Sequence, residues 1–418
     1  MQIKYLASEN FKKYGKCKEC QQANTGLKWC NSCNSKRFQE EFHKWTSGDK
    51  EIDEFIQRIQ LMANNHEEVI EWIPFDGLKN ITYLTEGGFS SVYKAIWPVG
   101  YIDSWNYKEK NWKRESQWEY VCLKILKSLD VFKDTDKRKF LQEIKNQLKF
   151  RGKGAIAVYG LTKNPIENEY FIVMKYATYG DLRKMLDNNF EKLSWIQKIR
   201  ILYYISNGLA NIHEAGLMHC DIHPGNIVNV SLTSSYISDF GLCKSLSLVS
   251  RNYKKRIYGY GVVPYMATET LSRGEYTRKS DIYSFGMIML EVFTSYPPYY
   301  NIPQDYVNRI MRIYKVLGLR PKIKYKIPQL LKDLMDKCWD IDPFNRPTAK
   351  ELEVQLEKYV NGDNSELEEQ IKEADEVNKN FKPYNPHSNI RYLYSLWGGK
   401  VGKGVWPNFW KFLLLILL

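Results

Sequence analysis

Two polar segments, at 219–226 and 239–241, constrain the fold of this 418-residue chain more than any other part of its sequence. The first reads His-Cys-Asp-Ile-His-Pro-Gly-Asn and has the composition of a loop, with Asp221 and Asn226 five positions apart. The second, Asp-Phe-Gly, places Asp239 at a strand end, 18 positions after Asp221. Phosphoryl transfer requires one carboxylate that orients a hydroxyl group and two oxygen ligands for Mg²⁺. A fold that suits this sequence must bring these three side chains together.

The order of motifs along the chain resembles that of the protein kinase superfamily. Downstream of the two loops come Ala-Thr-Glu at 267–269, Asp-Ile-Tyr-Ser-Phe-Gly at 281–286 and Arg-Pro at 346–347. The resemblance covers roughly 280 residues in the family's motif order. It implies a bilobal α+β fold, in which a β-rich N-lobe precedes a helical C-lobe. It also implies a buried ion pair between Glu269 and Arg346, and a brace from Asp281 to the backbone of the catalytic loop.

The same resemblance implies a role for each candidate catalytic residue. Asp221 would orient the substrate hydroxyl group and accept its proton, while Asn226 and Asp239 would hold Mg²⁺. Lys124, on a strand, would bind the α- and β-phosphates of ATP. Glu143, on the following helix, would hold the ammonium group of that lysine in place.

A glycine-containing segment at 84–92 is predicted to cover the phosphates, because glycine lets backbone N–H groups approach an anion closely. The three glycines of the family pattern fall on Thr85, Gly87 and Ser90, so only the middle one is kept, and a simple β-hairpin is the alternative. The segment 170–177 resembles the strand that leads into the hinge between lobes. Cys122 is interpreted as a small buried apolar residue beside adenine, with a reactive thiol as the alternative. The predicted ATP-binding residues are Leu84, Thr85, Glu86, Gly87, Gly88, Phe89, Val92, Cys122, Lys124, Met174, Lys175 and Ala177.

Two residues of the catalytic loop depart from the family pattern. Cys220 stands where most members have an arginine that pairs with a phosphate on the activation loop. Activity is therefore predicted to depend less on phosphorylation of that loop. His223 stands where Ser/Thr-specific kinases usually have a phosphate-binding lysine, and its protonated ring is predicted to replace that lysine in part.

Four cysteines near the N-terminus, Cys17, Cys20, Cys30 and Cys33, form two Cys-x-x-Cys pairs. Such pairs can present four thiolates tetrahedrally to a structural Zn²⁺ ion, which would supply much of the folding free energy of a short polar segment. A disulfide pair and an iron–sulfur site are the alternatives. Together with Trp-Thr-Ser-Gly at 45–48, the cluster resembles the N-terminal Cys-rich segment of the expanded kinases of arbuscular mycorrhizal fungi.

Composition divides the chain into five segments. We expect a Cys-rich zinc-binding module at 1–50, a helical connector at 51–76, a kinase domain at 77–360, an acidic helix or linker at 361–389 and an apolar tail at 390–418. The final apolar run is shorter than the roughly 20 residues of a membrane helix. It is interpreted as a docking or disordered tail, with a membrane anchor and a gene-model artefact as alternatives. The polar N-terminus and the scattered remaining cysteines predict a cytoplasmic or nuclear protein.

The net charge of +13 does not by itself predict a nucleic-acid partner. Residues 1–50 carry 10 Lys/Arg and 5 Asp/Glu without a dense basic face. A protein contact or a purely structural role is therefore expected for the zinc module, rather than nucleic-acid binding. An insertion at about 97–120, rich in tryptophan, is predicted to shield a sheet edge or to present a partner surface.

Taken together, the motifs predict an ATP- and Mg²⁺-dependent protein kinase that acts on Ser or Thr of a protein substrate. The similarity is greater to tyrosine-kinase-like Ser/Thr kinases than to true tyrosine kinases. The competing hypothesis is a pseudokinase scaffold, which the incomplete glycine pattern, Cys220 and His223 favour. A third class, nucleic-acid binding through the zinc module, predicts strongly salt-dependent binding by residues 1–50.

Overall fold

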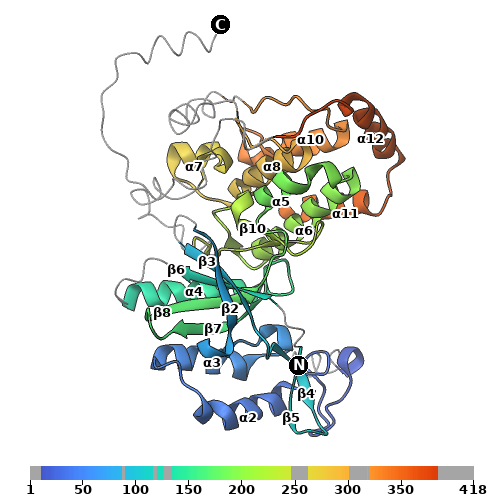
Figure 1. The fold of residues 1–418 in the computed structure, drawn as a ribbon. Coiled ribbons are helices and arrows are strands. Elements are labelled where there is room, and N and C mark those ends of the chain that lie inside the picture. The colour runs from blue at the N-terminus through green and yellow to red at the C-terminus, as the bar shows by residue number, and fades with distance from the viewer. Residues whose placement is uncertain are drawn as a thin grey trace, which may run out of the picture.

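The computed structural model describes residues 11–86, 90–115, 120–126, 134–245, 262–300, 318 and 320–384. It confirms the expected bilobal α+β architecture, with a sheet-based N-lobe and a helical C-lobe (Figure 1). Gly87, Gly88 and Phe89 of the predicted phosphate-covering segment lie outside the described residues, as does the predicted tail at 390–418.

A six-stranded sheet forms the N-lobe, in the order β1-β7-β8-β6-β3-β2. Its strands are β1 (Glu71–Trp72), β2 (Lys79–Glu86), β3 (Ser90–Ile96), β6 (Tyr120–Leu126), β7 (Val158–Asn164) and β8 (Glu169–Lys175). Neighbouring strands are antiparallel, except that β1 pairs with β7 in parallel. Five consecutive residues of β8, at 170–174, are buried, as expected of a strand that is covered on both faces.

Two helices share one buried apolar cluster with this sheet. The helix α4 (Asp134–Lys149) contributes Phe140 and Ile144, and α3 (Lys50–Met62) contributes Ile52 and Ile56. Each pair is spaced four residues apart and so lies on one face of its helix. The segment 51–76, predicted as a helical connector, is α-helical only as far as Met62, and its residues 71–72 join the sheet as β1.

The tryptophan-rich insertion forms an antiparallel hairpin of β4 (Tyr101–Asn106) and β5 (Asn111–Glu115). This hairpin packs against the Cys-rich segment, whose helix is α2 (Asn31–Glu41). The shared buried residues are Trp29, Phe38, Ala63, Val69, Ile102 and Trp112. Figure 1 shows α2, α3 and the hairpin gathered at the end of the N-lobe that faces away from the C-lobe.

The C-lobe is built around α8, in which every residue from 280 to 294 is buried. A helix with no polar face belongs in a protein interior. The helices of this lobe are α5 (Leu182–Asn189), α6 (Trp195–Glu214), α7 (Thr268–Arg273), α8 (Arg278–Thr294), α10 (Gln329–Cys338), α11 (Ala349–Val360) and α12 (Ser365–Asn378). No helix in the described ranges is long and apolar enough to cross a bilayer.

Candidate active site

The loop at 219–226 runs from β9 (Leu217–Met218) to β10 (Ile227–Asn229), and its backbone is held by Asp281 of α8. The Oδ2 atom of Asp281 accepts the N–H of His219 and its Oδ1 atom accepts the N–H of Cys220, both at 2.9 Å. Cys220 has a φ of +68°, in the left-handed region that L-residues seldom adopt. The two bonds from Asp281 therefore hold the loop in a conformation that its sequence alone would not favour.

Asn226 connects the catalytic loop to the segment that carries Asp239. Its Nδ2 atom donates to the backbone oxygen of Asp221 at 2.9 Å and to the carboxylate of Asp221 at 3.1 Å. Its backbone oxygen accepts the N–H of Ser238 at 2.8 Å. With the amide nitrogen committed to Asp221, the side-chain oxygen of the buried Asn226 is left for another partner. An amide oxygen is a suitable ligand for Mg²⁺.

Lys124 on β6 bridges two carboxylates that come from different elements. Its Nζ atom lies 3.0 Å from Oε1 of Glu143 on α4 and 3.1 Å from Oδ2 of Asp239, which follows β11 (Ser235–Ile237). Lys124 and Glu143 are buried, whereas the side chain of Asp239 is 40% exposed and so is accessible to a ligand. The structure thus brings together three of the side chains predicted to act on ATP and Mg²⁺.

The charges of these three groups depend on one another. Burial lowers the pKa of Lys124, but Asp239 and Glu143 outweigh burial and raise it above the ordinary value. Burial raises the pKa of Glu143, against the attraction of Lys124. Desolvation opposes the ionised form of Asp239, but Lys124 outweighs it and lowers the pKa of that carboxyl group. At neutral pH the ammonium group is therefore protonated and Asp239 is ionised, as a phosphate contact and a metal ligand require.

His223 lies over the loop, with its ring between Gly225 and Asp221. Its Nδ1 atom accepts the N–H of Gly225 at 3.1 Å, and its Nε2 atom lies 3.7 Å from Oδ2 of Asp221. A Cβ atom at position 225 would come within 2.8 Å of the ring, so this close approach requires glycine. Burial disfavours a charged ring, but the carboxylate of Asp221, with smaller contributions from Asp239 and Asp181, outweighs burial and raises the pKa of His223.

The residues predicted to line an adenine pocket flank Lys124 on neighbouring strands. Val92 of β3 is paired in register with Lys124, and Cys122 is paired with Met174 of β8. Burial raises the pKa of Cys122 to about 12, so its thiol is protonated at neutral pH. This favours the interpretation of Cys122 as a small apolar residue over that of a reactive thiol.

The other predicted ATP-binding residues that the structure describes lie at the ends of strands β2 and β8 or just beyond them. Leu84, Thr85 and Glu86 end β2, and Thr85 is paired with Val92. The N–H of Lys175 donates to the backbone oxygen of Ala157 at 2.9 Å, so this amide is already used inside the protein. Lys175 and Ala177 are the predicted ATP-binding residues at the end of the 170–177 segment, and of their two N–H groups that of Ala177 is therefore the better candidate to bind adenine.

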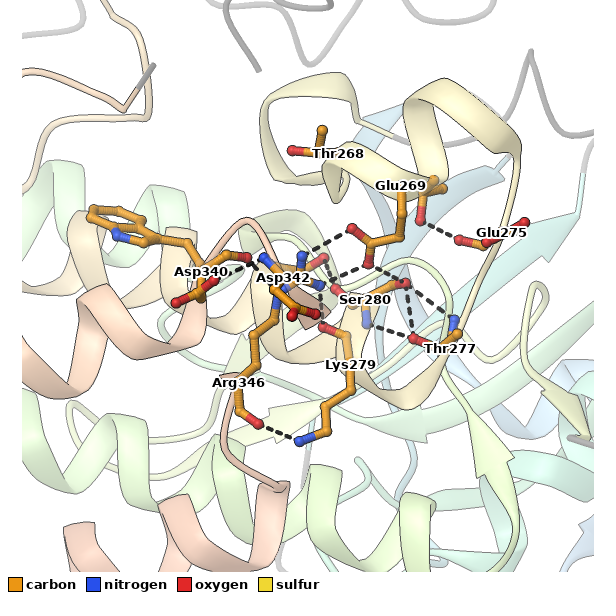
Figure 2. Close-up of polar contacts among 12 residues, drawn as sticks. Thr268, Glu269, Glu275, Thr277, Lys279, Ser280, Asp340, Asp342 and Arg346 are labelled. Carbon is orange, nitrogen blue, oxygen red and sulfur yellow. Dashed lines mark hydrogen bonds and ion pairs between the residues drawn. The ribbon is translucent and has the colours of Figure 1, made fainter. Parts of the chain in front are cut away.

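The pair predicted between Glu269 and Arg346 is present and bidentate (Figure 2). Nη1 of Arg346 lies 2.7 Å from Oε1 and Nη2 lies 2.9 Å from Oε2. The guanidinium group also donates to the backbone oxygens of Lys279 and Asp340, each at 2.9 Å. The Arg346 side chain is 0% exposed, so the pair links α7, α8 and the turn before α11 in the interior of the C-lobe.

The four N-terminal cysteines converge on one point. Their sulfur atoms all lie within 4.8 Å of one another, with 3.7 Å between Cys17 and Cys33 and 3.6 Å between Cys20 and Cys30. Tetrahedral coordination at a Zn–S distance of about 2.3 Å places sulfur atoms about 3.8 Å apart, whereas a disulfide needs about 2.05 Å. All four cysteines are unpaired, and the arrangement therefore fits a metal ion.

The contact between the insertion and the Cys-rich segment was not predicted. Trp112 stacks on Phe38 with ring centroids 4.5 Å apart and on Trp29 at 5.8 Å, and its Nε1 atom donates to Glu41 at 3.2 Å. The guanidinium group of Arg37 lies 4.2 Å from the ring centroid of Trp105. The Cys-rich segment thus makes this contact with another part of its own chain, the hairpin of β4 and β5. The tryptophan content of the insertion was the signal in the sequence that pointed to such a contact.

Residues 78–356 match the family model described as "Protein tyrosine and serine/threonine kinase". The chain is 31% identical over 303 residues to "Probable serine/threonine-protein kinase gdt2" of Dictyostelium discoideum, which covers 70% of this chain and 16% of that protein. It is 27% identical over 286 residues to human "Ankyrin repeat and protein kinase domain-containing protein 1", with coverage of 66% and 34%. It is also 27% identical over 301 residues to mouse "Receptor-interacting serine/threonine-protein kinase 4", with coverage of 69% and 35%. The chain therefore spans about a third or less of the length of these relatives.

Proposed function

The chain belongs to the protein tyrosine and serine/threonine kinase family, and on this basis we propose that it is an active kinase that phosphorylates Ser or Thr residues of a protein substrate with ATP. The observation that supports activity most directly is the position of Lys124 between Glu143 and Asp239. Burying the charged groups of Lys124 and Glu143 costs desolvation free energy. The binding of nucleotide phosphates and a metal ion would explain why the protein keeps this costly arrangement of charges.

Each residue of the site has a place in the proposed reaction. When bound, Mg²⁺ and ATP supply the phosphoryl group and a counter-charge for it. Lys124 would bind phosphate oxygens while Glu143 holds its ammonium group in position. The oxygens of Asn226 and Asp239 would hold Mg²⁺, and both belong to the ligand types that this ion prefers. Asp221 would orient the substrate hydroxyl group and accept its proton.

The preference for Ser and Thr is supported by the names of the relatives, which include serine/threonine-protein kinases. The test is to incubate the purified chain with Mg²⁺, γ-labelled ATP and a mixture of protein substrates, and to map the phosphorylated sites by mass spectrometry. We expect labelled phosphoserine and phosphothreonine. Sites on tyrosine alone would contradict the substrate class. Nucleotide binding without transfer would identify the pseudokinase alternative, which the departures at Cys220 and His223 favour.

We predict that the protonation of His223 controls the rate in the neutral pH range. The structure presents Nδ1 as an acceptor, as in the neutral ring, whereas the nearby carboxylates raise the pKa and favour protonation. The pKa of His223 is raised in spite of its burial, so we expect the protonated ring to form beside Asp221 although protonation of Nδ1 gives up the hydrogen bond from Gly225. A raised pKa means that the cation persists to higher pH than usual and is lost as the pH rises further.

The kcat of the wild type should therefore fall as the pH is raised from 6 to 8 and above, while His223→Gln should show a lower and flatter profile. Steady-state rates at fixed ionic strength measure this. His43→Gln, at the far end of the N-lobe, is the matched control and should keep the wild-type profile. A flat wild-type profile would rule out this role for His223.

We also propose that Cys17, Cys20, Cys30 and Cys33 hold a structural Zn²⁺ ion. The purified chain should contain about one zinc ion per molecule, measured by elemental mass spectrometry. Cys33→Ser should lose most of the zinc, because a structural site uses all four thiolates. Cys243→Ser, which removes a cysteine outside the cluster, should retain it. Full zinc content in Cys33→Ser, or iron in the wild type, would contradict the assignment.

A further inference from the structure

The helix that carries Glu143 is not held by the sheet alone. The middle of α4 contributes Phe140, Leu141 and Ile144 to a buried apolar cluster that also contains Ile52, Phe55 and Ile56 of α3. The C-terminal half is fixed separately, because Nε2 of Gln147 donates to the backbone oxygen of Ile156 at 3.0 Å. The part of α4 around Glu143 therefore shares its apolar cluster with a helix from outside the segment that matches the kinase family model.

An ionic contact joins the same two helices. Nζ of Lys137, on the first turns of α4, lies 2.6 Å from Oδ2 of Asp49 and 3.4 Å from Oε2 of Glu51. The side chain of Lys137 is 13% exposed, so the contact is largely shielded from solvent. Asp49 also caps α3, since its other oxygen accepts the N–H groups of Glu51 and Ile52. Lys137 precedes Glu143 by six residues, which is about 9 Å along a helix.

The opposite end of α3 is held by the Cys-rich segment that contains the four converging cysteines, which we call the cysteine module. Asn31 donates from Nδ2 to the backbone oxygens of Leu61 and Ala63, at 3.0 and 2.9 Å. Nε1 of Trp29 donates to the same oxygen of Ala63 at 3.0 Å. The last carbonyl groups of a helix have no partner inside it, so these donors satisfy groups that would otherwise need water. Trp29 and Asn31 are the two neighbours of Cys30, one of the four converging cysteines.

We propose that the cysteine module positions the catalytic ion pair through α3, and that Lys137 is a positioning residue for Glu143. A continuous set of contacts runs from the cysteine cluster through Asn31 to α3, and from Asp49 through Lys137 to α4 and the Glu143–Lys124 pair. The module thereby keeps the ion pair assembled from within the same chain. The expected effect on the reaction rate rests on the proposed kinase activity. The expected effect on the order of α4 does not depend on that activity.

The first test measures the rate of phosphate transfer by the full chain. Lys137→Met should lower kcat about three- to tenfold with little change in KM for the protein substrate. The reason is that a partly buried ion pair contributes more stabilising free energy than an exposed one. Lys137→Arg should restore most of the rate. Asp49→Asn keeps the helix cap but removes the charge, and combining it with Lys137→Met should add little to the single loss. Lys145→Met, on an exposed position of the same helix, is the control and should leave kcat unchanged.

The second test does not depend on activity. Asn31→Ala removes two of the hydrogen bonds between the module and α3 without altering a cysteine. It should speed amide hydrogen exchange across both 50–62 and 134–149 while zinc stays bound. Asn188→Ala, which removes an exposed asparagine of the C-lobe, should leave both segments unchanged. Unchanged exchange at 134–149 in Asn31→Ala and Lys137→Met would overturn the proposal. Faster exchange in a chain that transfers no phosphate would support the coupling and reject only the proposed kinase activity.

Discussion

Replacement of Asp221 by asparagine should reduce kcat for phosphate transfer by about 10²- to 10⁴-fold, the usual contribution of a positioned general base. Asparagine has nearly the same shape and can still accept the 3.1 Å hydrogen bond from Asn226 with its oxygen. It cannot take up the hydroxyl proton. The loop backbone should keep its conformation, because Asp281 holds it through residues 219 and 220.

Phosphate incorporation from γ-labelled ATP measures this loss, and nucleotide affinity measured in parallel should change little. Asp333→Asn, which alters an exposed aspartate of α10, is the matched control and should retain the wild-type rate. Transfer that persists at the wild-type rate in Asp221→Asn would show that this carboxylate is not the base. It would also show that the proposed mechanism is wrong.

Replacement of Arg346 by methionine should lower the free energy of unfolding by about 3–5 kcal/mol, because it leaves a carboxylate in the interior without its partner. Arg346 is fully buried and bidentate to Glu269, and two backbone oxygens would lose their donor with it. Methionine fills a similar volume, so the loss measures charge and hydrogen bonding more than packing. Urea unfolding followed by circular dichroism gives the difference.

Two further variants separate this pair from a general sensitivity to substitution. Arg273→Met, on an exposed position of α7, should change stability by less than about 0.5 kcal/mol. Removing both charges with Glu269→Gln and Arg346→Met should destabilise less than the sum of the two single changes, as coupled partners do. Additive losses would mean that the two residues do not act as a pair.

The parts of the site that the sequence predicted are those whose motifs have fixed spacing and local chemistry. Asp221 and Asn226 lie five positions apart on one loop, so their contact follows from local geometry, and the placement of Lys124 before a helix with Glu143 indicated the ion pair. The β1–β7 pairing was not predictable, because a two-residue strand has no periodicity. Nor was the contact of Trp112 with Trp29 and Phe38, which depends on how two distant segments meet.

The β1 strand limits where the chain can be shortened at its N-terminal side. It covers one edge of the sheet through its pairing with β7, and the N–H of Ile73 extends that pairing to Leu161 at 2.8 Å. A fragment limited to 78–356, the length that matches the family model, would expose that edge and the apolar face of α4 to water. Unpaired strand edges invite pairing between molecules. The segment that matches the family model is therefore shorter than the segment that this protein needs to cover the edge of its own sheet.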